Sequence, residues 1–127
     1  MLAYDRNFTP PAPVADVTVA HPVTGESSGA RRGKLDTGAD FTVIPEGLLD
    51  ELALAPQGEV WARSYDGTYS QRFVYYVRLT IEGHALATVR CVAGDRSTVL
   101  VGRNALNRFV ITLDGPNLRF DLRLARR

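Results

Sequence analysis

The sequence predicts an all-β protein, a closed or nearly closed β-barrel with one or two short helices. Three observations lead to this fold class. Short apolar runs recur along the chain and are separated by turn signals such as Asp66-Gly67 and Asp114-Gly115. Residues 73–82 repeat with the two-residue period of a strand. Only two brief stretches have helical character.

The 127 residues suit one domain with a buried core. Hydrophobic residues make up 45% and charged residues 23% of the chain, as in an ordinary globular protein. Pro10, Pro11 and Pro13 disfavour a regular element near the start. We therefore expect an extended N-terminal arm over residues 1–13 and a single folded domain over residues 14–127.

The charge balance argues against several classes of partner. A net charge of +1 provides no overall field to attract nucleic acid or membrane, and no apolar run reaches membrane-spanning length. The single cysteine, Cys91, cannot form an internal disulfide and fits a reducing compartment. His21 and His84 lie in turns without ligands at metal spacing. We expect a cytoplasmic protein with no cofactor, no metal, and no nucleic-acid or membrane partner.

The first half of the chain is expected to form two paired strands and a helix. Residues 14–20 read as a strand, residues 21–29 as a turn and residues 30–35 as the returning strand. Pro45 at a tolerated first position and Glu46 near the positive end of the dipole predict a short helix. Its core-facing residues would be Leu48, Leu49 and Leu52.

The second half is expected to be a series of hairpins. Strands are predicted at 58–65 and from 68 onward, then at 85–92 and 98–101. A short helix follows at 103–108. A last hairpin joins strands 109–113 and 118–122.

The loop Asp36-Thr37-Gly38-Ala39-Asp40 lies between two short apolar runs. Gly38 allows close approach of the backbone, and the Thr37 hydroxyl can both donate and accept a hydrogen bond. The loop therefore holds the Asp36 carboxylate in a fixed position. The same residues also suit an ordinary turn between strands, in which Asp36 would have no chemical role.

A second motif, Leu100-Val101-Gly102-Arg103-Asn104, is an apolar strand that ends at glycine and enters a short helix. Together, the two motifs resemble the retropepsin-like aspartic proteases, the family of retroviral proteases and their single-domain cellular relatives. The resemblance extends from about residue 14 to residue 122. It implies a retropepsin-like barrel in which the second motif packs beneath the first.

The resemblance also implies a reaction, the hydrolysis of peptide bonds by an aspartic endopeptidase. Two carboxylates that share one proton can supply both the base that activates water and the acid that assists the carbonyl oxygen. Pepsin-like proteins carry two Asp-Thr-Gly motifs in a chain of more than twice this length, whereas this chain carries one. The simplest source of the second carboxylate is a symmetric homodimer, in which two Asp36 residues pair and act on a protein or peptide substrate.

The family assigns roles to further residues. Asp36, Thr37 and Gly38 would be catalytic, with Thr37 bonding across the dimer and the Gly38 amide orienting the carboxylate. Asp40 would form an ion pair with Arg103. The expected structural supports are Gly102, Arg103 and Asn104. The expected substrate-binding residues are Lys34, Ala39, Asp40, Phe41, Tyr65, Asp66, Gly67, Thr68 and Leu100.

Within this set, the hairpin around Asp66-Gly67 occupies the position of the family's flap, the lid that closes over substrate. Tyr65 and Tyr69 flank it and could contact substrate or simply pack. Lys34 replaces an apolar residue that lines a subsite in the family, so the subsite favours an acidic or polar side chain or catalysis is weakened. Phe41 would be an apolar subsite wall or a core residue.

Two other interpretations remain open from the sequence. One is a catalytically silent module that keeps the fold for dimerisation or peptide binding, which Lys34 favours. The other is a monomeric β-barrel in which Asp36 is only a turn residue. The intact Asp36-Thr37-Gly38 motif and Arg103 favour the enzyme.

Overall fold

The computed structural model describes residues 1–63 and 66–125. The described chain is mostly β-structure. Its strands are β1 (Leu2–Ala3), β2 (Val14–Ala20), β3 (Ser27–Leu35), β4 (Thr42–Pro45), β5 (Glu59–Arg63), β6 (Tyr69–Ile81), β7 (His84–Gly94), β8 (Val99–Val101), β9 (Phe109–Asp114) and β10 (Arg119–Leu124). The helices are α1 (Glu46–Glu51) and α2 (Arg103–Leu106).

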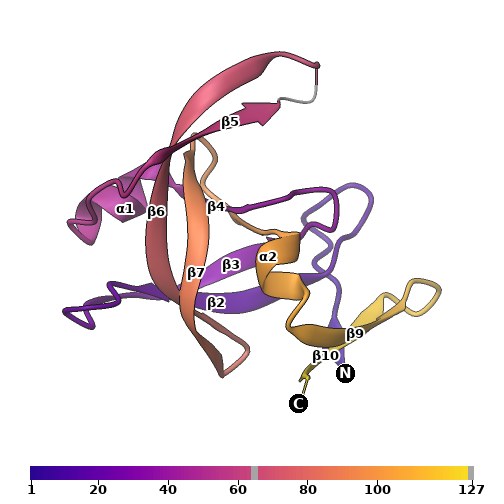
Figure 1. Ribbon diagram of the computed structural model, residues 1–127. Coiled ribbons are helices and arrows are strands. Elements are labelled where there is room, and N and C mark those ends of the chain that lie inside the picture. The colour runs from indigo at the N-terminus through magenta and orange to yellow at the C-terminus, as the bar shows by residue number, and fades with distance from the viewer. Residues whose placement is uncertain (64–65, 126–127) are drawn as a thin grey trace.

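The main sheet closes on itself into a barrel (Figure 1). Its strands follow the order β2-β3-β8-β4-β7-β6, and β6 pairs back with β2. Strand β5 pairs only with β6 among the described strands, so the β5–β6 hairpin extends beyond the ring. The predicted all-β fold, a closed barrel with two short helices, is confirmed.

The barrel interior holds the hydrophobic core. Alternate residues of β6 point inward, because Tyr75, Val77, Leu79 and Ile81 are all buried. Helix α1 begins after Pro45, and its Leu48 and Leu49 are buried, as is Leu52 just beyond its end. The three leucines predicted to face the core do so.

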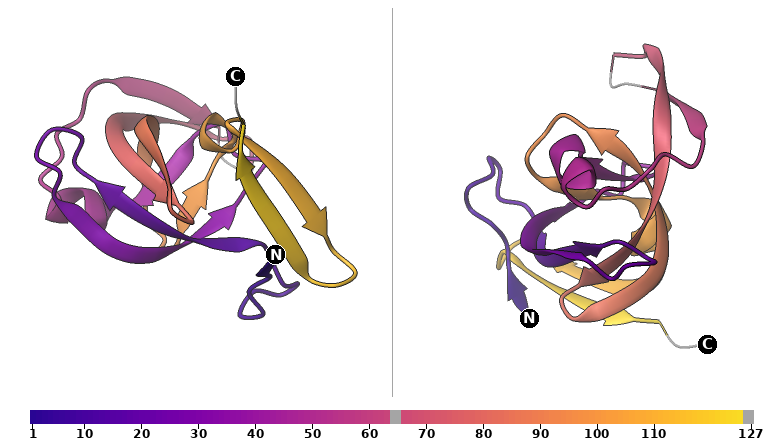
Figure 2. Two further views of the ribbon diagram at one scale, coloured as in Figure 1. Left: turned by 90° about the horizontal axis from the view of Figure 1, so that it is seen from below. Right: turned by 90° about the vertical axis from the view of Figure 1, so that its left-hand side faces the viewer.

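A smaller sheet in the order β1-β10-β9 lies beside the barrel (Figure 2). The N-terminal residues take part in it, because Leu2 pairs with Phe120 and Ala3 with Arg119. Asp5 then forms an isolated bridge with Ala12. Residues 1–13 thus fold back on the same chain and bring Phe8 within cation–π distance of Lys34.

Several element boundaries differ from the sequence prediction. Strand β3 starts at Ser27 rather than residue 30, because the polar residues that suggested a turn pair with the end of β2. Strand β4 was not predicted as an element. Its four residues are held between β7 and β8, a pairing of distant segments that local periodicity cannot show.

Candidate active site

The Asp36 loop joins β3 to β4 and is fixed by its own backbone. The Asp36 amide donates a hydrogen bond to the carbonyl oxygen of Val101 in β8 at 2.9 Å. The Gly38 amide donates to Asp36 Oδ1 at 3.0 Å, and the Ala39 amide donates to the Asp36 carbonyl oxygen at 3.2 Å. Asp36 is half-buried, while Thr37 and Gly38 are exposed. The loop therefore presents one oriented carboxylate at the surface of this chain.

Arg103 joins this loop to α2. Its amide donates to the Ala39 carbonyl oxygen at 2.8 Å, and its Nη1 donates to the Thr37 carbonyl oxygen at 2.8 Å. Its Nη2 forms an ion pair with Asp40, the pair that the family resemblance implies. The two side chains are 45% and 73% exposed, so the ion pair itself contributes little to stability. The bonds to the loop backbone are what hold its shape.

A buried hydrogen-bond network lies beneath the loop. Thr42 is fully buried. Its amide and its hydroxyl both donate hydrogen bonds to Asn104 Oδ1 at 3.0 Å. Its Oγ1 also accepts a hydrogen bond from the Gly102 amide at 3.2 Å. Asn104 Nδ2 donates to the Arg90 carbonyl oxygen at 2.6 Å. Gly102 and Asn104 lie under the loop, as the family resemblance implies, whereas Thr42 is not among the residues predicted from the sequence. The sequence signal that could have identified Thr42 is its position as a polar residue at the start of an apolar run.

Gly102 allows the two motifs to approach closely. A Cβ atom at this position would lie 2.5 Å from the carbonyl carbon and oxygen of Phe41 and 2.8 Å from the Thr42 nitrogen. These are backbone atoms, which cannot rotate out of the way. Glycine is therefore required where α2 packs against the end of the Asp36 loop.

Three of the predicted substrate-binding residues, Lys34, Leu100 and Phe41, lie in two different surroundings near the loop. Lys34 and Leu100 are paired neighbours on β3 and β8, and both are half-buried. Phe41 does not enter the core; its half-buried ring lies against the Arg90 guanidinium, whose carbon is 5.0 Å from the ring centroid. The structure thus brings Lys34 and Leu100 together beside Asp36 and directs Phe41 toward β7.

The hairpin tip is described only in part. Tyr65 lies outside the described residues. Asp66 Oδ1 accepts a hydrogen bond from the Thr68 amide at 3.0 Å, and this bond lowers the pKa of the Asp66 carboxyl. Gly67 has a φ of 87°, a conformation that favours glycine.

One face of the β5–β6 hairpin carries exposed aromatic side chains. Trp61, Tyr69 and Phe73 are 68%, 62% and 53% exposed. Trp61 pairs with Gln71, so it shares a face with the odd-numbered residues of β6. That face is the one that carries the core residues from Tyr75 onward. The aromatic face, defined by these three residues, therefore continues the inward face of the barrel wall beyond the core.

Tyr69 is among the residues predicted to flank the flap, whereas Trp61 and Phe73 are not among the site residues predicted from the sequence. The alternation of β6 was visible in the sequence, yet it did not show that the strand leaves the barrel before residue 74. The opposite face of the hairpin is better covered, because Arg72 Nη1 donates to the Ala93 carbonyl oxygen at 3.1 Å. The open aromatic face therefore depends on where the β5–β6 hairpin leaves the barrel, and Figure 1 shows the backbone of that hairpin extending beyond the ring.

The aspartyl protease family model matches residues 22–105, which include both motifs and the hairpin between them. The chain belongs to the aspartyl protease family. No curated protein matches the sequence significantly.

Solved structures of retropepsin-like and retroviral proteases have a similar fold. A retropepsin-like aspartic protease from Rickettsia conorii aligns over 89% of this chain and 82% of its own, with a TM-score of 0.60 and 17% identity. The simian foamy virus protease aligns over 75% of this chain and 92% of its own, with a TM-score of 0.55 and 18% identity. In a foamy viral protease–reverse transcriptase the match covers 76% of this chain, with a TM-score of 0.58 and 22% identity, but this chain spans only 12% of that longer protein.

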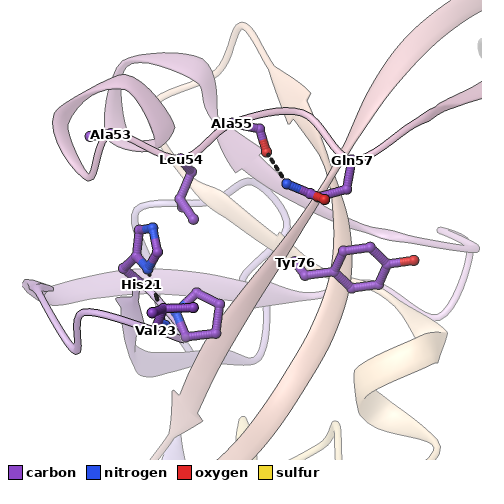
Figure 3. A pocket seen from close by; sticks show the side chains of 8 residues that line it. His21, Val23, Ala53, Leu54, Ala55, Gln57 and Tyr76 are labelled. Carbon is purple, nitrogen blue, oxygen red and sulfur yellow. Dashed lines mark hydrogen bonds between the residues drawn. The ribbon is translucent and has the colours of Figure 1, made fainter.

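A pocket of about 340 Å³ lies elsewhere on the barrel (Figure 3). Its lining includes His21, Leu54, Gln57 and Tyr76, and none of the Asp36 loop. His21 Nδ1 accepts the amides of the turn that follows it, at 3.1 and 3.2 Å. Among the described residues, the lining of this pocket includes no carboxylate.

In residues 1–63 and 66–125, no group of three or more histidine, cysteine, aspartate or glutamate side chains could hold a metal ion. No helix in this part of the chain is long and apolar enough to cross a membrane.

Cys91 is expected to be inert in the folded protein. Its thiol is fully buried in the core, and burial raises its pKa from 9.0 to about 12. A thiol reagent at pH 8 should therefore label the native protein at least about a hundredfold more slowly than the urea-unfolded chain. Rapid labelling of the native protein would contradict the burial of the thiol.

The same raised pKa predicts how stability depends on pH. Because the unfolded chain loses the Cys91 proton at a lower pH than the folded chain, the free energy of unfolding should fall as pH rises from about 9 to about 12.

Proposed function

We propose that this protein is an aspartic endopeptidase that acts as a homodimer, with the Asp36 residues of two copies activating water between them. The observation that carries the proposal is the oriented Asp36 carboxylate, bonded by the Gly38 amide in a loop that Arg103 braces. Membership of the aspartyl protease family supports it. Asp36, Thr37 and Gly38 are the residues proposed to be catalytic.

The chemistry requires a second carboxylate beside Asp36. One carboxylate, ionised, removes a proton from water; the other, protonated, donates to the carbonyl oxygen of the peptide bond as the tetrahedral intermediate forms. The other acidic residue of the loop is Asp40, which is paired with Arg103. A second copy of the chain is the simplest source of the missing group, and the exposed Thr37 is available to bond across the two loops.

A second copy could also pair with an open sheet edge. Strand β9 is at the edge of the small sheet, and its Val110 and Leu113 are 45% and 55% exposed. Unpaired backbone groups and exposed apolar side chains on an edge strand favour association with another chain. This edge is consistent with the proposed dimer.

The β5–β6 hairpin is proposed to be the flap that closes over a peptide. Its aromatic face continues the inward face of the barrel wall, so it is suited to pack on an extended substrate. Asp66, Gly67 and Thr68 form the described part of its tip. The substrate is proposed to be a protein or peptide, and the free thiol of Cys91 favours a reducing compartment such as the cytoplasm.

Truncating the aromatic face should weaken substrate binding. Burying about 60 Å² of the Trp61 indole against a peptide stabilises the complex by about 1.5 kcal/mol, roughly tenfold in affinity. Trp61→Ala and Tyr69→Ala should therefore each raise KM by roughly tenfold with a smaller effect on kcat. Tyr76→Ala, on the opposite face of β6, is the matched control and should leave KM unchanged. If Tyr69→Ala and Tyr76→Ala changed KM equally, the assignment of the hairpin as a flap would be wrong.

The direct test of the proposed function is cleavage of a diverse peptide pool between pH 3.5 and 7.5, read by mass spectrometry. The proposal predicts internal cleavage of peptides by the purified protein, with no added metal or cofactor. A folded dimer that binds peptides and cuts none would instead support a silent peptide-binding module.

A further inference from the structure

Three neighbouring strands place one cation in an otherwise aliphatic row. Lys34 of β3 pairs with Leu100 of β8, and Leu100 pairs with Val43 of β4. All three are half-buried, and we call them the Lys34 row. The residues on either side of Lys34, Gly33 and Leu35, are buried on the core side. The Lys34 row therefore lies on the face turned away from the core.

The Lys34 row lies next to Asp36, which follows Lys34 by two residues at the end of β3. The amide of Asp36 continues the β3–β8 pairing through its bond to the Val101 carbonyl oxygen at 2.9 Å. Residues two apart on an extended chain share a face and lie roughly 7 Å from each other. A peptide bound with its scissile bond at Asp36 therefore has a side chain beside Lys34 one or two residues from that bond.

Lys34 contacts the N-terminal arm and, in the part of the chain that the structure describes, forms no ion pair. Its Nζ lies 5.2 Å from the centroid of the Phe8 ring, a cation–π contact from the N-terminal arm. The ion pairs formed among the described residues involve Arg31, Arg32 and Arg103, and none involves Lys34. Asp5, the nearest acid to Phe8 in the arm, is paired with Arg32.

We propose that Lys34 makes this protein select an acidic side chain, glutamate or aspartate, within two residues of the scissile bond. The inference rests on the proposed function, because it places the peptide along the Lys34 row. An ammonium ion in an aliphatic row attracts a carboxylate and disfavours a basic side chain. In a symmetric dimer each subunit contributes one such row, so an acidic residue is accepted on either side of the bond.

The test compares matched peptides that differ only by glutamate, glutamine or lysine at each position near the cleaved bond. The wild type should cut the glutamate peptide about tenfold faster, in kcat/KM, than its glutamine counterpart. Lys34→Gln should reduce this ratio to about one, and Lys34→Glu should reverse it in favour of lysine. Arg31→Gln is the matched control, because it removes an exposed charge from the same strand and should keep the wild-type ratio. Equal ratios in the wild type and Lys34→Gln would overturn the inference.

A binding measurement separates this inference from the proposed function. The same peptides are titrated onto Asp36→Asn and onto the double variant Asp36→Asn/Lys34→Gln by calorimetry. A glutamate preference that disappears with Lys34 supports the inference even if the wild type cuts nothing, in which case only the proposed function fails. Cleavage by the wild type without any charge preference overturns the inference alone. A protein that neither cuts nor binds any peptide overturns both.

Discussion

Replacing Asp36 by asparagine should lower peptide hydrolysis by about a thousandfold or more, because the variant cannot act as base or share a proton. Asparagine has the same shape, and its Oδ1 can still accept the Gly38 amide. The circular dichroism spectrum and the sedimentation behaviour should therefore match those of the wild type. The rate is measured on a peptide that the wild type cuts well.

Asp50→Asn is a suitable control, because Asp50 is an exposed acid on α1 that belongs to neither motif. It should leave the rate within a factor of two of wild type. If Asp36→Asn retained the wild-type rate, the hydrolysis would belong to another group or to a contaminant, and the aspartic mechanism would be wrong.

Replacing Gly102 by alanine should destabilise the protein by about 3 kcal/mol, near the upper end for an overpacked site. The added Cβ would lie 2.5 Å from the Phe41 carbonyl group, so the backbone of the Asp36 loop or of α2 must move. The bonds that Arg103 and Asn104 make to that loop should weaken as a result. Urea unfolding should show a lower midpoint with an unchanged slope. The activity should fall by more than the loss of folded protein accounts for.

Gly47→Ala is the matched control for this substitution. Gly47 lies in the first turn of α1, and among the described residues no atom outside its chain neighbours and its own helix backbone lies within 4 Å of a Cβ placed there. Alanine in this first turn should leave the free energy of unfolding unchanged or raise it by less than about 1 kcal/mol. A Gly102→Ala variant as stable and as active as Gly47→Ala would contradict the close packing of the two motifs.

Much of the fold could be predicted from the sequence because its strands have strong local signals. The alternation in β6 and the turn at Asp114-Gly115 fix where strands lie, and Pro45-Glu46 marks the start of α1. The order of strands around the barrel depends on pairings between distant segments. The parallel contact of β3 with β8 and the position of β4 between β7 and β8 follow only from the assembled structure.

The candidate site was predictable where a motif carried it. The ion pair of Asp40 with Arg103 and the supporting position of Gly102 followed from the family resemblance that the two motifs carry. The contact of Phe8 with Lys34 and that of Phe41 with Arg90 join segments without any shared motif, so no local pattern could indicate them. Trp61 became apparent only once the register of the hairpin placed it opposite Gln71.

The most direct test of the central claim, two Asp36 residues from two copies, is a subunit-mixing experiment. Wild type and Asp36→Asn are unfolded together and refolded at increasing proportions of the variant, with wild type held constant. The account predicts that activity falls to about half at equal amounts, because random pairing divides wild-type chains between active and mixed dimers. Activity that stays constant as the variant is added would show that one chain suffices, and would contradict the shared active site.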